Sequence, residues 1–373
     1  MSAKQKTISL FGMSETQIAA SLAEAGLDVP RYRSRQIYNA LYGKRIRSFA
    51  EATDLPRDLR EQLDKLFPIV HPNITHESRS IDGTIKYLFE LSDARTIEAV
   101  LIPSEMRDSY GIARRKTLCL STQVGCPLDC KFCATATLKL KRDLTTAEII
   151  AQYFEVERAS GEHITNVVYM GMGEPMLNYD NVVASLRILT DKELDILGSK
   201  RITVSTSGLP DEIRKFAREG LGVKLALSLH ATTDELRSKL MPINRRYPLA
   251  EVISAMEEYY KTTKIPVTYE YILFAGLNDT PADAKRLAKF ARRMPSKVNV
   301  IPFHPIDFTH PTGVAASLHP STDLAFKNFI SLLKELGAHV MVRSSAGVDI
   351  EAACGQLALS NEPHLHEISI AEV

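Results

Sequence analysis

Seven short apolar runs that follow Lys116 constrain the fold of this chain more than any other feature. Helical stretches separate the runs, and strands that alternate with helices form a parallel sheet. Because no GxGxxG motif follows the first run, a TIM-like barrel fits better than an open dinucleotide-binding sheet. We therefore expect an α/β fold, a partial (β/α)6 barrel. The runs are TLCLSTQV (117–124), ITNVVYMG (164–171), RITVSTSG (201–208), VKLALSLHA (223–231), VTYEYILFAG (267–276), KVNVIPFHP (297–305) and HVMVRSSAG (339–347).

Small and polar residues end nearly every run. Loops at the carboxyl ends of parallel strands contribute such residues to ligand sites. Ser205 lies in TVSTSG, and Ser228, Leu229 and His230 form SLH. Hydroxyl groups and an imidazole at these positions can hold a ribose or a carboxylate, although each alone is also typical of an ordinary strand end.

The sequence pattern divides the chain into three parts. Residues 1–80 predict a small, basic helical domain, because the pattern is helical from about Ser14 to Leu66. In residues 81–104 two runs of β-branched and aromatic residues flank the turn-forming SDAR, which predicts a β-hairpin extension or linker. Residues 105–373 hold the barrel and a C-terminal segment that contains Cys354.

No overall charge draws this chain to nucleic acid, because its formal net charge is +1 and its pI is about 7.7. A local patch exists, since residues 31–47 carry six Lys or Arg, three Tyr and no acid. Such residues grip RNA loops by phosphate contacts and stacking, although a solvated helix face has the same composition. RRK at 114–116 and KLKR at 139–142 can extend this patch toward the barrel.

The first residues lack the apolar core of a secretory signal, and no run reaches the length of a transmembrane helix. We therefore expect a cytoplasmic protein with no membrane partner. The chain has five cysteines, three of them clustered. In a reducing compartment this spacing is more typical of metal binding or catalysis than of a disulfide framework.

The clustered cysteines, Cys126, Cys130 and Cys133, form a C-x3-C-x2-C motif that we call the cysteine triad. A structural zinc ion takes four ligands, commonly in C-x2-C pairs, and no second pair is present. A cubane iron–sulfur cluster fits better, because three thiolates leave one iron open to another ligand. The alternatives are three unconnected buried thiols, or a zinc site completed by Cys119, Cys354 or a histidine.

The triad, with Phe132 before its last cysteine, resembles the signature of the radical S-adenosylmethionine (SAM) superfamily. The resemblance implies a radical SAM barrel with one 4Fe–4S cluster, whose open iron binds the amino and carboxylate groups of SAM. An electron from the cluster then cleaves SAM to a 5′-deoxyadenosyl radical, while the protein positions and shields the reactants. In GMGEP, Gly171 and Gly173 let the backbone approach a ligand closely, and the resemblance places Glu174 at the SAM amino group.

Longer strings narrow the resemblance to one family. GMGEP, STSG, LSLHATTDELRSKLMPINRRYPL and DIEAACGQL resemble the RlmN group of RNA adenine C2-methyltransferases, over roughly residues 31–357. The resemblance implies methylation of C2 of an adenosine in the peptidyl-transferase centre of 23S rRNA and, in many members, of the adenosine 3′ of the tRNA anticodon. It implies two SAM molecules per methylation and an N-terminal RNA-binding domain. We also expect a flavodoxin- or ferredoxin-type electron donor and a monomer.

A radical is required because adenine C2 lies between two ring nitrogens, is electron-poor, and cannot attack the SAM methyl group. By resemblance, Cys354 takes a methyl group from one SAM, and the radical from a second SAM activates that S-methyl group. A base then takes the C2 proton, and a disulfide between Cys354 and a second thiol releases the product. The resemblance gives these two roles to Glu98 and Cys119. By itself, Glu98 is typical of a solvated charge and Cys119 of a small buried hydrophobe.

Two features depart from the family pattern. His304 in VIPFHP stands where the family has an asparagine that contacts SAM, and its titration near neutral pH would make SAM affinity pH-sensitive. RSSAGVDIEAACGQL lacks the RG-D-D pattern of C2 enzymes and is closer to the sister group Cfr, which methylates C8, whereas Pro175 is usual in C2 enzymes. The alternatives are therefore C8 methylation, a radical SAM enzyme for a small molecule, and a non-catalytic zinc-bearing RNA-binding protein.

Overall fold

The computed structural model describes residues 9–27, 29–106, 109, 111, 113–343 and 345–358. A ten-stranded sheet forms its core, in the order β1-β2-β3-β4-β7-β8-β9-β10-β11-β12, and β5 and β6 form a separate pair. The strands are β1 (Asn73–Arg79), β2 (Ile85–Glu90), β3 (Thr96–Pro103), β4 (Lys116–Cys119), β5 (Gln123–Val124), β6 (Arg142–Asp143), β7 (Asn166–Tyr169), β8 (Ile202–Thr206), β9 (Lys224–Ser228), β10 (Val267–Leu273), β11 (Ser296–Pro302) and β12 (Val340–Val342).

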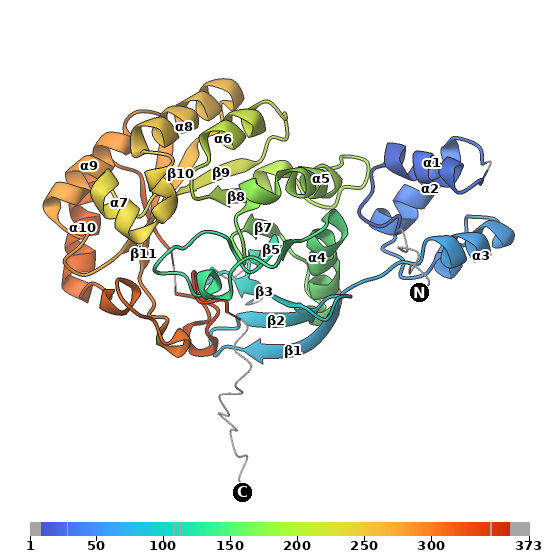
Figure 1. Cartoon of the computed structure of the whole chain (residues 1–373), viewed down its shortest axis with the longest axis horizontal. Coiled ribbons are helices and arrows are strands. Elements are labelled where there is room, and N and C mark those ends of the chain that lie inside the picture. The colour runs from blue at the N-terminus through green and yellow to red at the C-terminus, as the bar shows by residue number, and fades with distance from the viewer. Residues whose placement is uncertain are drawn as a thin grey trace, which may run out of the picture.

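Seven parallel strands, β4 and β7 to β12, form the barrel. Each of the seven predicted runs contains one of them, and helices cover the outside of the curved sheet (Figure 1). Among the described strands the order does not close, since β1 and β12 lie at the two edges. The predicted partial α/β barrel is confirmed, with seven parallel strands in the described chain where six units were predicted. The helices are α1 (Glu15–Glu24), α2 (Tyr32–Tyr38), α3 (Arg57–Leu66), α4 (Thr146–Ser160), α5 (Tyr179–Leu189), α6 (Pro210–Ala217), α7 (Asp234–Leu240), α8 (Leu249–Thr263), α9 (Pro281–Ala291) and α10 (Asp323–Glu335).

Local sequence signals set the ends of α4, the first helix of the barrel. The Thr145 side chain accepts a hydrogen bond from Glu148 N, and the Glu148 carboxylate accepts one from Thr145 N at 2.9 Å, which forms a capping box. Gly161 ends the helix with φ 67°, in the left-handed region that glycine adopts readily. None of the described helices is both long and apolar enough to cross a membrane.

An antiparallel extension precedes the barrel. β2 and β3 form the hairpin predicted within residues 81–104, and β3 also pairs antiparallel with β4. β1 pairs with β2, so Asn73–Arg79, which the sequence pattern placed in the helical domain, belongs to the sheet. The helical part therefore ends with α3 at Leu66.

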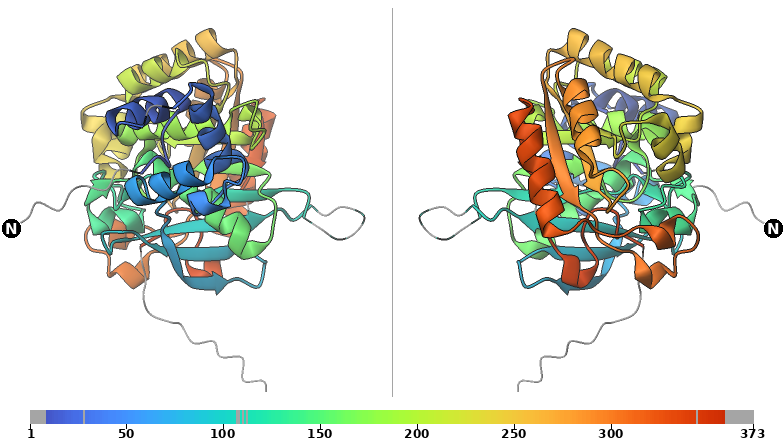
Figure 2. Two further views of the ribbon diagram at one scale, coloured as in Figure 1. Left: turned by 90° about the vertical axis from the view of Figure 1, so that its right-hand side faces the viewer. Right: turned by 90° about the vertical axis from the view of Figure 1, so that its left-hand side faces the viewer.

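The helical part, α1 to α3, lies beside α4 and α5 on the outside of the barrel (Figures 1 and 2). Four of the six basic residues in residues 31–47 form ion pairs within the protein, some of them to the barrel. This patch therefore helps to hold the helical part in place. Its other two cations, Arg31 and Arg33, form no ion pair in the described part of the chain. The pairs are Arg35 with Glu15 and Glu193, Lys44 with Asp54, Arg45 with Glu157, and Arg47 with Glu155.

Candidate active site

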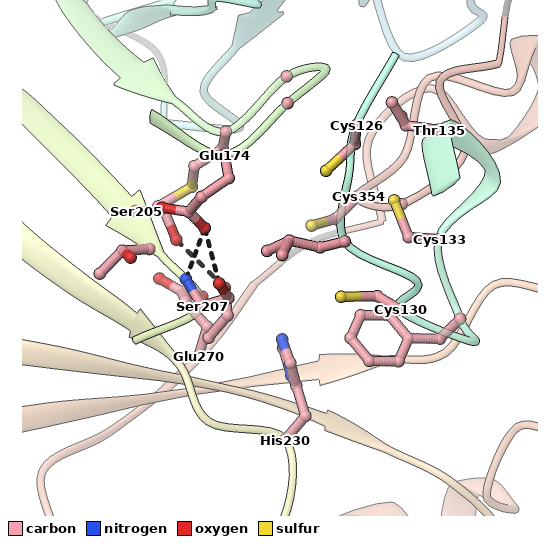
Figure 3. Close-up of a pocket in the computed structure, with 18 of the residues that line it drawn as sticks. Cys126, Cys130, Cys133, Thr135, Glu174, Ser205, Ser207, His230, Glu270 and Cys354 are labelled. Carbon is pink, nitrogen blue, oxygen red and sulfur yellow. Dashed lines mark hydrogen bonds between the residues drawn. The ribbon is translucent and has the colours of Figure 1, made fainter. Parts of the chain in front are cut away.

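A cavity lies at the carboxyl ends of the barrel strands, against the loop that carries the cysteine triad (Figure 3). In the figure the sulfur atoms of the triad and of Cys354 face the space opposite Glu174 and Ser205. The rim expected from the strand ends therefore exists, and it gathers most of the predicted site residues. Those that line the cavity are Cys126, Cys130, Cys133, Gly173, Glu174, Ser205, Ser228, His230 and Cys354.

The cysteine loop is held in place by the protein itself. Phe132 packs against His230, with ring centroids 4.7 Å apart, and against Phe274. Gly125 begins the loop with φ 77°, and a Cβ atom there would lie 1.9 Å from Lys139 O, so a side chain cannot be accommodated. The path of the loop is fixed by these contacts, and the triad is presented on one side of the cavity.

Cys126 is buried and Cys130 and Cys133 are partly buried, and their three thiols can serve as ligands of an iron–sulfur cluster. Burial raises the pKa of Cys126 to about 12 and also raises the pKa values of Cys130 and Cys133, because a buried thiolate loses its hydration. Bound metal would supply the positive charge that keeps them as thiolates. Among the described residues, no group of three or more His, Cys, Asp or Glu is arranged to hold one metal ion. Three thiolates, one on each of three irons, would suit a cubane cluster, whereas a closed zinc site needs a fourth ligand.

Glu174 is buried in the cavity wall, and two neighbouring segments orient its carboxylate. Oε1 accepts a hydrogen bond from Met176 N at 3.1 Å, and Oε2 accepts from both N and Oγ of Ser207 at 2.8 Å. Burial raises the pKa of this carboxyl group, whereas the hydrogen bonds from Ser207 and Met176 oppose the rise. A carboxylate held in one orientation can pair with an ammonium group of a ligand.

The ends of β8 and β9 provide polar groups next to Glu174. The Oγ atoms of Ser205 and Ser228 lie 3.3 Å apart. His230 has φ 51°, and its Nδ1 accepts a hydrogen bond from Ile272 N at 3.1 Å. Burial lowers the pKa of His230 to about 3, so the ring is neutral and carries its proton on Nε2. Two hydroxyl groups and one N–H are therefore available to an oxygen-rich ligand.

Gly171 and Gly173 are explained by packing within the protein. A Cβ atom on Gly171 would lie 2.7 Å from Leu120 O, and one on Gly173 would lie 2.6 Å from the Gln123 side chain. Gly173 also has φ 102°, in the left-handed region. The backbone at these two glycines thus already packs closely against the segment that follows β4, and this packing alone requires glycine.

Cys354 lies between two adjoining cavities. One is the cavity of the triad, and the other is lined by Cys119, His304 and Arg343 as well as by Cys354. Burial raises the pKa of Cys354 and raises that of Cys119 to about 12, and the positive charge of Arg343 opposes the rise in both. The two cysteines with predicted reactive roles thus share a cavity, and both are free thiols in this structure.

Hydrogen bonds to the turn between β1 and β2 fasten the segment that carries Cys354. Asp349 accepts from Ser80 Oγ at 2.6 Å and from Ile81 N at 3.2 Å. In the opposite direction, Asp82 of the turn accepts from Gly347 N at 2.9 Å. These reciprocal contacts, which we call the aspartate clasp, fix the approach of the chain to Cys354.

Glu98 is 2 % exposed on β3, so it is not a solvated charge. It shares a face of the sheet with Cys119, because Val100, two residues further on, pairs directly with Cys119. Its carboxylate lies 3.3 Å from Lys86 Nζ, and the same Nζ lies 3.5 Å from Glu351 O in the Cys354 segment. Glu98 is not among the residues that line the two cavities, but Lys86 connects it to the segment between them.

Comparison with known proteins agrees with this arrangement. The family model described as the radical SAM superfamily matches residues 120–291. A probable dual-specificity RNA methyltransferase RlmN of Thermotoga neapolitana is 42% identical over 358 residues, which cover 95% of this chain and 98% of that protein. This chain belongs to the RlmN family. The Geotalea uraniireducens protein named dual-specificity RNA methyltransferase RlmN is 43% identical over 333 residues, 89% of this chain and 92% of that protein.

A solved structure supports the RlmN-family fold. The crystal structure of a radical SAM methyltransferase from Sphaerobacter thermophilus matches with a TM-score of 0.83 and 40% sequence identity. The match covers 94% of this chain and 99% of that one. The resemblance predicted from the sequence strings and the radical SAM fold are therefore both confirmed.

His304, which the sequence resemblance set at the position of an asparagine that contacts SAM, lines the cavity of Cys119 and Cys354. Within the described part of the chain its Nε2 is buried and has no hydrogen-bond partner. Burial lowers the pKa of His304 below its ordinary value of 6.5, so the ring is neutral at pH 7. The pH sensitivity expected from the sequence is thereby shifted to more acidic pH.

The structure also corrects one predicted site residue and adds two that the sequence analysis did not name. Leu229 is fully buried and does not line the cavity, because its side chain belongs to the core. Glu270 and Arg343 do line it, and the sequence analysis named neither. Glu270 Oε1 accepts from Asn299 at 2.9 Å, and its Oε2 is buried without a partner in the described part. Glu270 could have been noticed in the sequence, because it is the single acid inside the apolar run VTYEYIL.

Proposed function

We propose that this chain is a SAM-dependent RNA methyltransferase that methylates C2 of an adenosine in 23S rRNA and C2 of the adenosine 3′ of the tRNA anticodon. Its relatives in the RlmN family, which are named dual-specificity RNA methyltransferases, support RNA methylation. The observation that carries the proposal is the position of Cys354, which lines both the triad cavity and the cavity of Cys119.

The cysteine triad would hold one 4Fe–4S cluster, and the remaining cavity wall would bind SAM. When bound, the cluster supplies the electron that cleaves SAM to a 5′-deoxyadenosyl radical. Glu174 accepts hydrogen bonds from the SAM amino group, because its carboxylate is already oriented by Ser207. Ser205, Ser228 and His230 donate hydrogen bonds to the oxygen atoms of SAM. The apolar packing around the cysteine loop limits access of water.

Cys354 carries the methyl group from SAM to RNA. Its sulfur takes the methyl group of one SAM molecule, and the same S-methyl group then gives up hydrogen and bonds to adenine. Two SAM molecules are therefore used for each methylation. Arg343, whose charge opposes the pKa rise of Cys354, favours the thiolate that the first transfer needs.

Release of the product depends on Glu98 and Cys119. The adduct would return one electron to the oxidised cluster, and Glu98 takes the C2 proton. Cys119 then attacks the Cys354 sulfur to form a disulfide, the bond from that sulfur to the methylene carbon breaks, and this carbon keeps the electron pair and takes a proton to become the methyl group of the released base. The shared cavity brings Cys119 within the surroundings of Cys354, and the pair of Glu98 with Lys86 keeps a buried carboxylate next to the Cys354 segment. C2 chemistry is favoured over C8 because Pro175 is usual in C2 enzymes.

The wider setting follows from the same proposal. We infer a cytoplasmic monomer that receives electrons from a flavodoxin- or ferredoxin-type donor and binds RNA through its helical part. Arg31 and Arg33 are exposed and partly exposed cations at the start of α2, and Arg33 lies over the Tyr32 ring at 4.9 Å. Such a cation–aromatic pair suits stacking against RNA.

Analysis of the RNA product tests this proposal. The purified protein is loaded with iron and sulfide without oxygen, reduced, and reacted with methyl-labelled SAM and fragments of 23S rRNA or tRNA. NMR of the digested RNA is expected to show the labelled methyl group bound to C2 of adenine. Label on C8 would support the Cfr-type alternative. SAM cleavage without labelled RNA would support a small-molecule substrate, and a colourless zinc protein would support an RNA-binding role.

A further inference from the structure

Arg237 is one of the largest side chains that are fully buried in the described part of the chain. It lies on α7, next to the ends of β8 and β9, and its guanidinium makes four hydrogen bonds. Nε donates to Leu229 O at 3.1 Å, and Nη1 donates to Asn244 Oδ1 at 3.0 Å. Nη2 donates to Ser207 O at 2.5 Å and to Ser228 O at 3.1 Å. All four acceptors are neutral oxygens.

The charge of Arg237 is therefore not balanced by an acid in direct contact. In the part of the chain that the structure describes, Arg237 forms no ion pair, and the groups whose charge raises its pKa are Cys130 and Asp234. The Asp234 carboxylate is itself engaged by Asn244 Nδ2 at 2.9 Å and by Leu249 N at 2.8 Å. An unpaired buried cation is unfavourable because it has lost its hydration. An anion on the cysteine side would offset this cost.

Arg237 stays charged at neutral pH in spite of its burial. Burial lowers the pKa of its guanidinium to about 10, which still leaves it protonated at pH 7. Its guanidinium lies behind the cavity wall, because it binds the carbonyl groups of Ser207 and Ser228, two residues that line the cavity. Cys130 lines the same cavity.

Helix α7 joins the strand ends to the cysteine loop. At its C-terminal end, Leu240 O accepts a hydrogen bond from Lys131 N of the loop at 2.9 Å. Leu240 and Met241 belong to the apolar cluster that includes Phe132 of the same loop. At the other side, Arg237 binds the carbonyl group of Ser207, whose N–H and hydroxyl orient Glu174. Helix α7 thus connects, through Arg237 at one point and Leu240 at another, the carboxylate proposed to bind SAM with the loop that holds the triad.

We propose that Arg237 is the fixed counter-charge of the cysteine triad and raises the reduction potential of the iron–sulfur cluster held there. The inference rests on the proposed function, because it needs a cluster on the triad. Reduction adds one negative charge to the cluster, and a buried cation nearby stabilises the more negative state. Arg237 acts through its charge and its carbonyl contacts, so it is a positioning residue rather than a catalytic one.

Redox titration of three forms of the full-length, anaerobically loaded protein tests the proposal. The Arg237→Gln variant removes the charge and keeps one amide donor for the carbonyl groups, and the Arg237→Lys variant keeps the charge. Electron paramagnetic resonance gives the cluster potential at each poise. We expect Arg237→Gln to have about tenfold less reduced cluster at a fixed potential, a shift of about 59 mV to more negative values for one electron. Arg237→Lys is expected to remain near the wild-type potential.

A second variant covers the case in which Arg237→Gln does not fold or does not retain iron. Asn244→Asp places a carboxylate against Nη1 while Arg237 remains, and it is expected to shift the potential in the same direction. Wild-type potentials in folded, iron-loaded Arg237→Gln, or in Asn244→Asp where the first variant fails, would overturn the proposal. Failure of the wild-type protein to bind iron would instead contradict the proposed function, so the two failures are distinguishable.

Discussion

The two walls of the active site are built in different ways. The wall that we propose for SAM consists of residues at strand ends, such as Glu174, Ser205 and Ser228, where the parallel sheet fixes the backbone. The wall that carries Cys354 follows β12, and the regular structure of its described residues is one 3-10 turn at Val348–Ile350. Its position depends on separate contacts, among them the aspartate clasp and the bond from Ala134 N to Gly355 O at 2.7 Å.

We propose that this difference separates the binding of SAM from the transfer of its methyl group. A cofactor site needs one geometry, and a sheet supplies it through many cooperative hydrogen bonds. A methyl carrier has to meet both SAM and RNA, and a segment held by a few side chains suits that task. Substitutions in one wall are therefore expected to leave the function of the other largely unchanged.

Cys354→Ala has the largest expected effect. Methyl transfer to RNA should be lost completely, because no other cysteine of the described chain lines both cavities, while SAM affinity should change by less than about twofold. Transfer of labelled methyl groups and equilibrium binding of SAM measure the two properties. Turnover by this variant would contradict the role of Cys354, and loss of SAM affinity would show that the walls are not separate.

Cys119→Ala should stop the reaction at a later point. Cys354 should still be methylated and still bond to RNA, but release should fail because the second thiol is missing. Gel electrophoresis under denaturing conditions should show an RNA–protein adduct that the wild type does not accumulate. Rapid turnover without an adduct would refute the assignment, and a variant with free Cys119 but no Cys354 serves as the control.

Glu174→Gln tests the SAM wall. A hydrogen bond between charged groups contributes about 1.5–3 kcal/mol, so SAM affinity should fall by roughly ten- to a hundredfold. Binding of SAM to the iron-loaded protein is the measurement. Asp180→Asn, at a side chain that is 95% exposed, is the matched control and should bind normally. Unchanged affinity in Glu174→Gln would remove this residue from the SAM site.

Asp349→Asn tests the Cys354 wall. Loss of the charge-assisted hydrogen bonds to Ser80 and Ile81 should lower the free energy of unfolding by about 1–2 kcal/mol. Alkylation of Cys354, followed by peptide mass spectrometry, should become faster, while SAM affinity stays the same. Asp211→Asn, at a side chain that is 87% exposed, should change neither. A weaker SAM affinity in Asp349→Asn alone would show that the clasp also shapes the SAM wall.

His304 gives the smallest expected effect. Burial lowers its pKa below 6.5, so the midpoint of its protonation and of any change in activity should lie on the acidic side of that value. The ratio of the SAM affinities of wild type and His304→Asn should therefore be constant between about pH 7 and pH 9 and should change only at lower pH. A difference that titrates above pH 7 would contradict the neutral ring.

Sequence periodicity predicted the barrel because strand runs and their small, polar ends are local properties. The triad, Glu174 and the serines could be named for the same reason, since each lies within a short motif. The aspartate clasp could not, because Asp349 and Ser80 are 269 residues apart in the chain. Arg237 was also missed, since its meaning depends on which carbonyl groups surround it and on the lack of an acid beside it. Gly171 shows that one residue can have two reasons, because it lines the cavity as its motif suggested and a side chain there would also meet Leu120.

The most direct test of the account follows the labelled methyl group through the protein. The iron-loaded enzyme is reacted without oxygen with methyl-labelled SAM and then digested, with and without RNA, for peptide mass spectrometry. The account predicts label on Cys354 before RNA is added, and transfer of that label to adenine when RNA and reductant are present. Labelled RNA with no label at any time on Cys354 would contradict it.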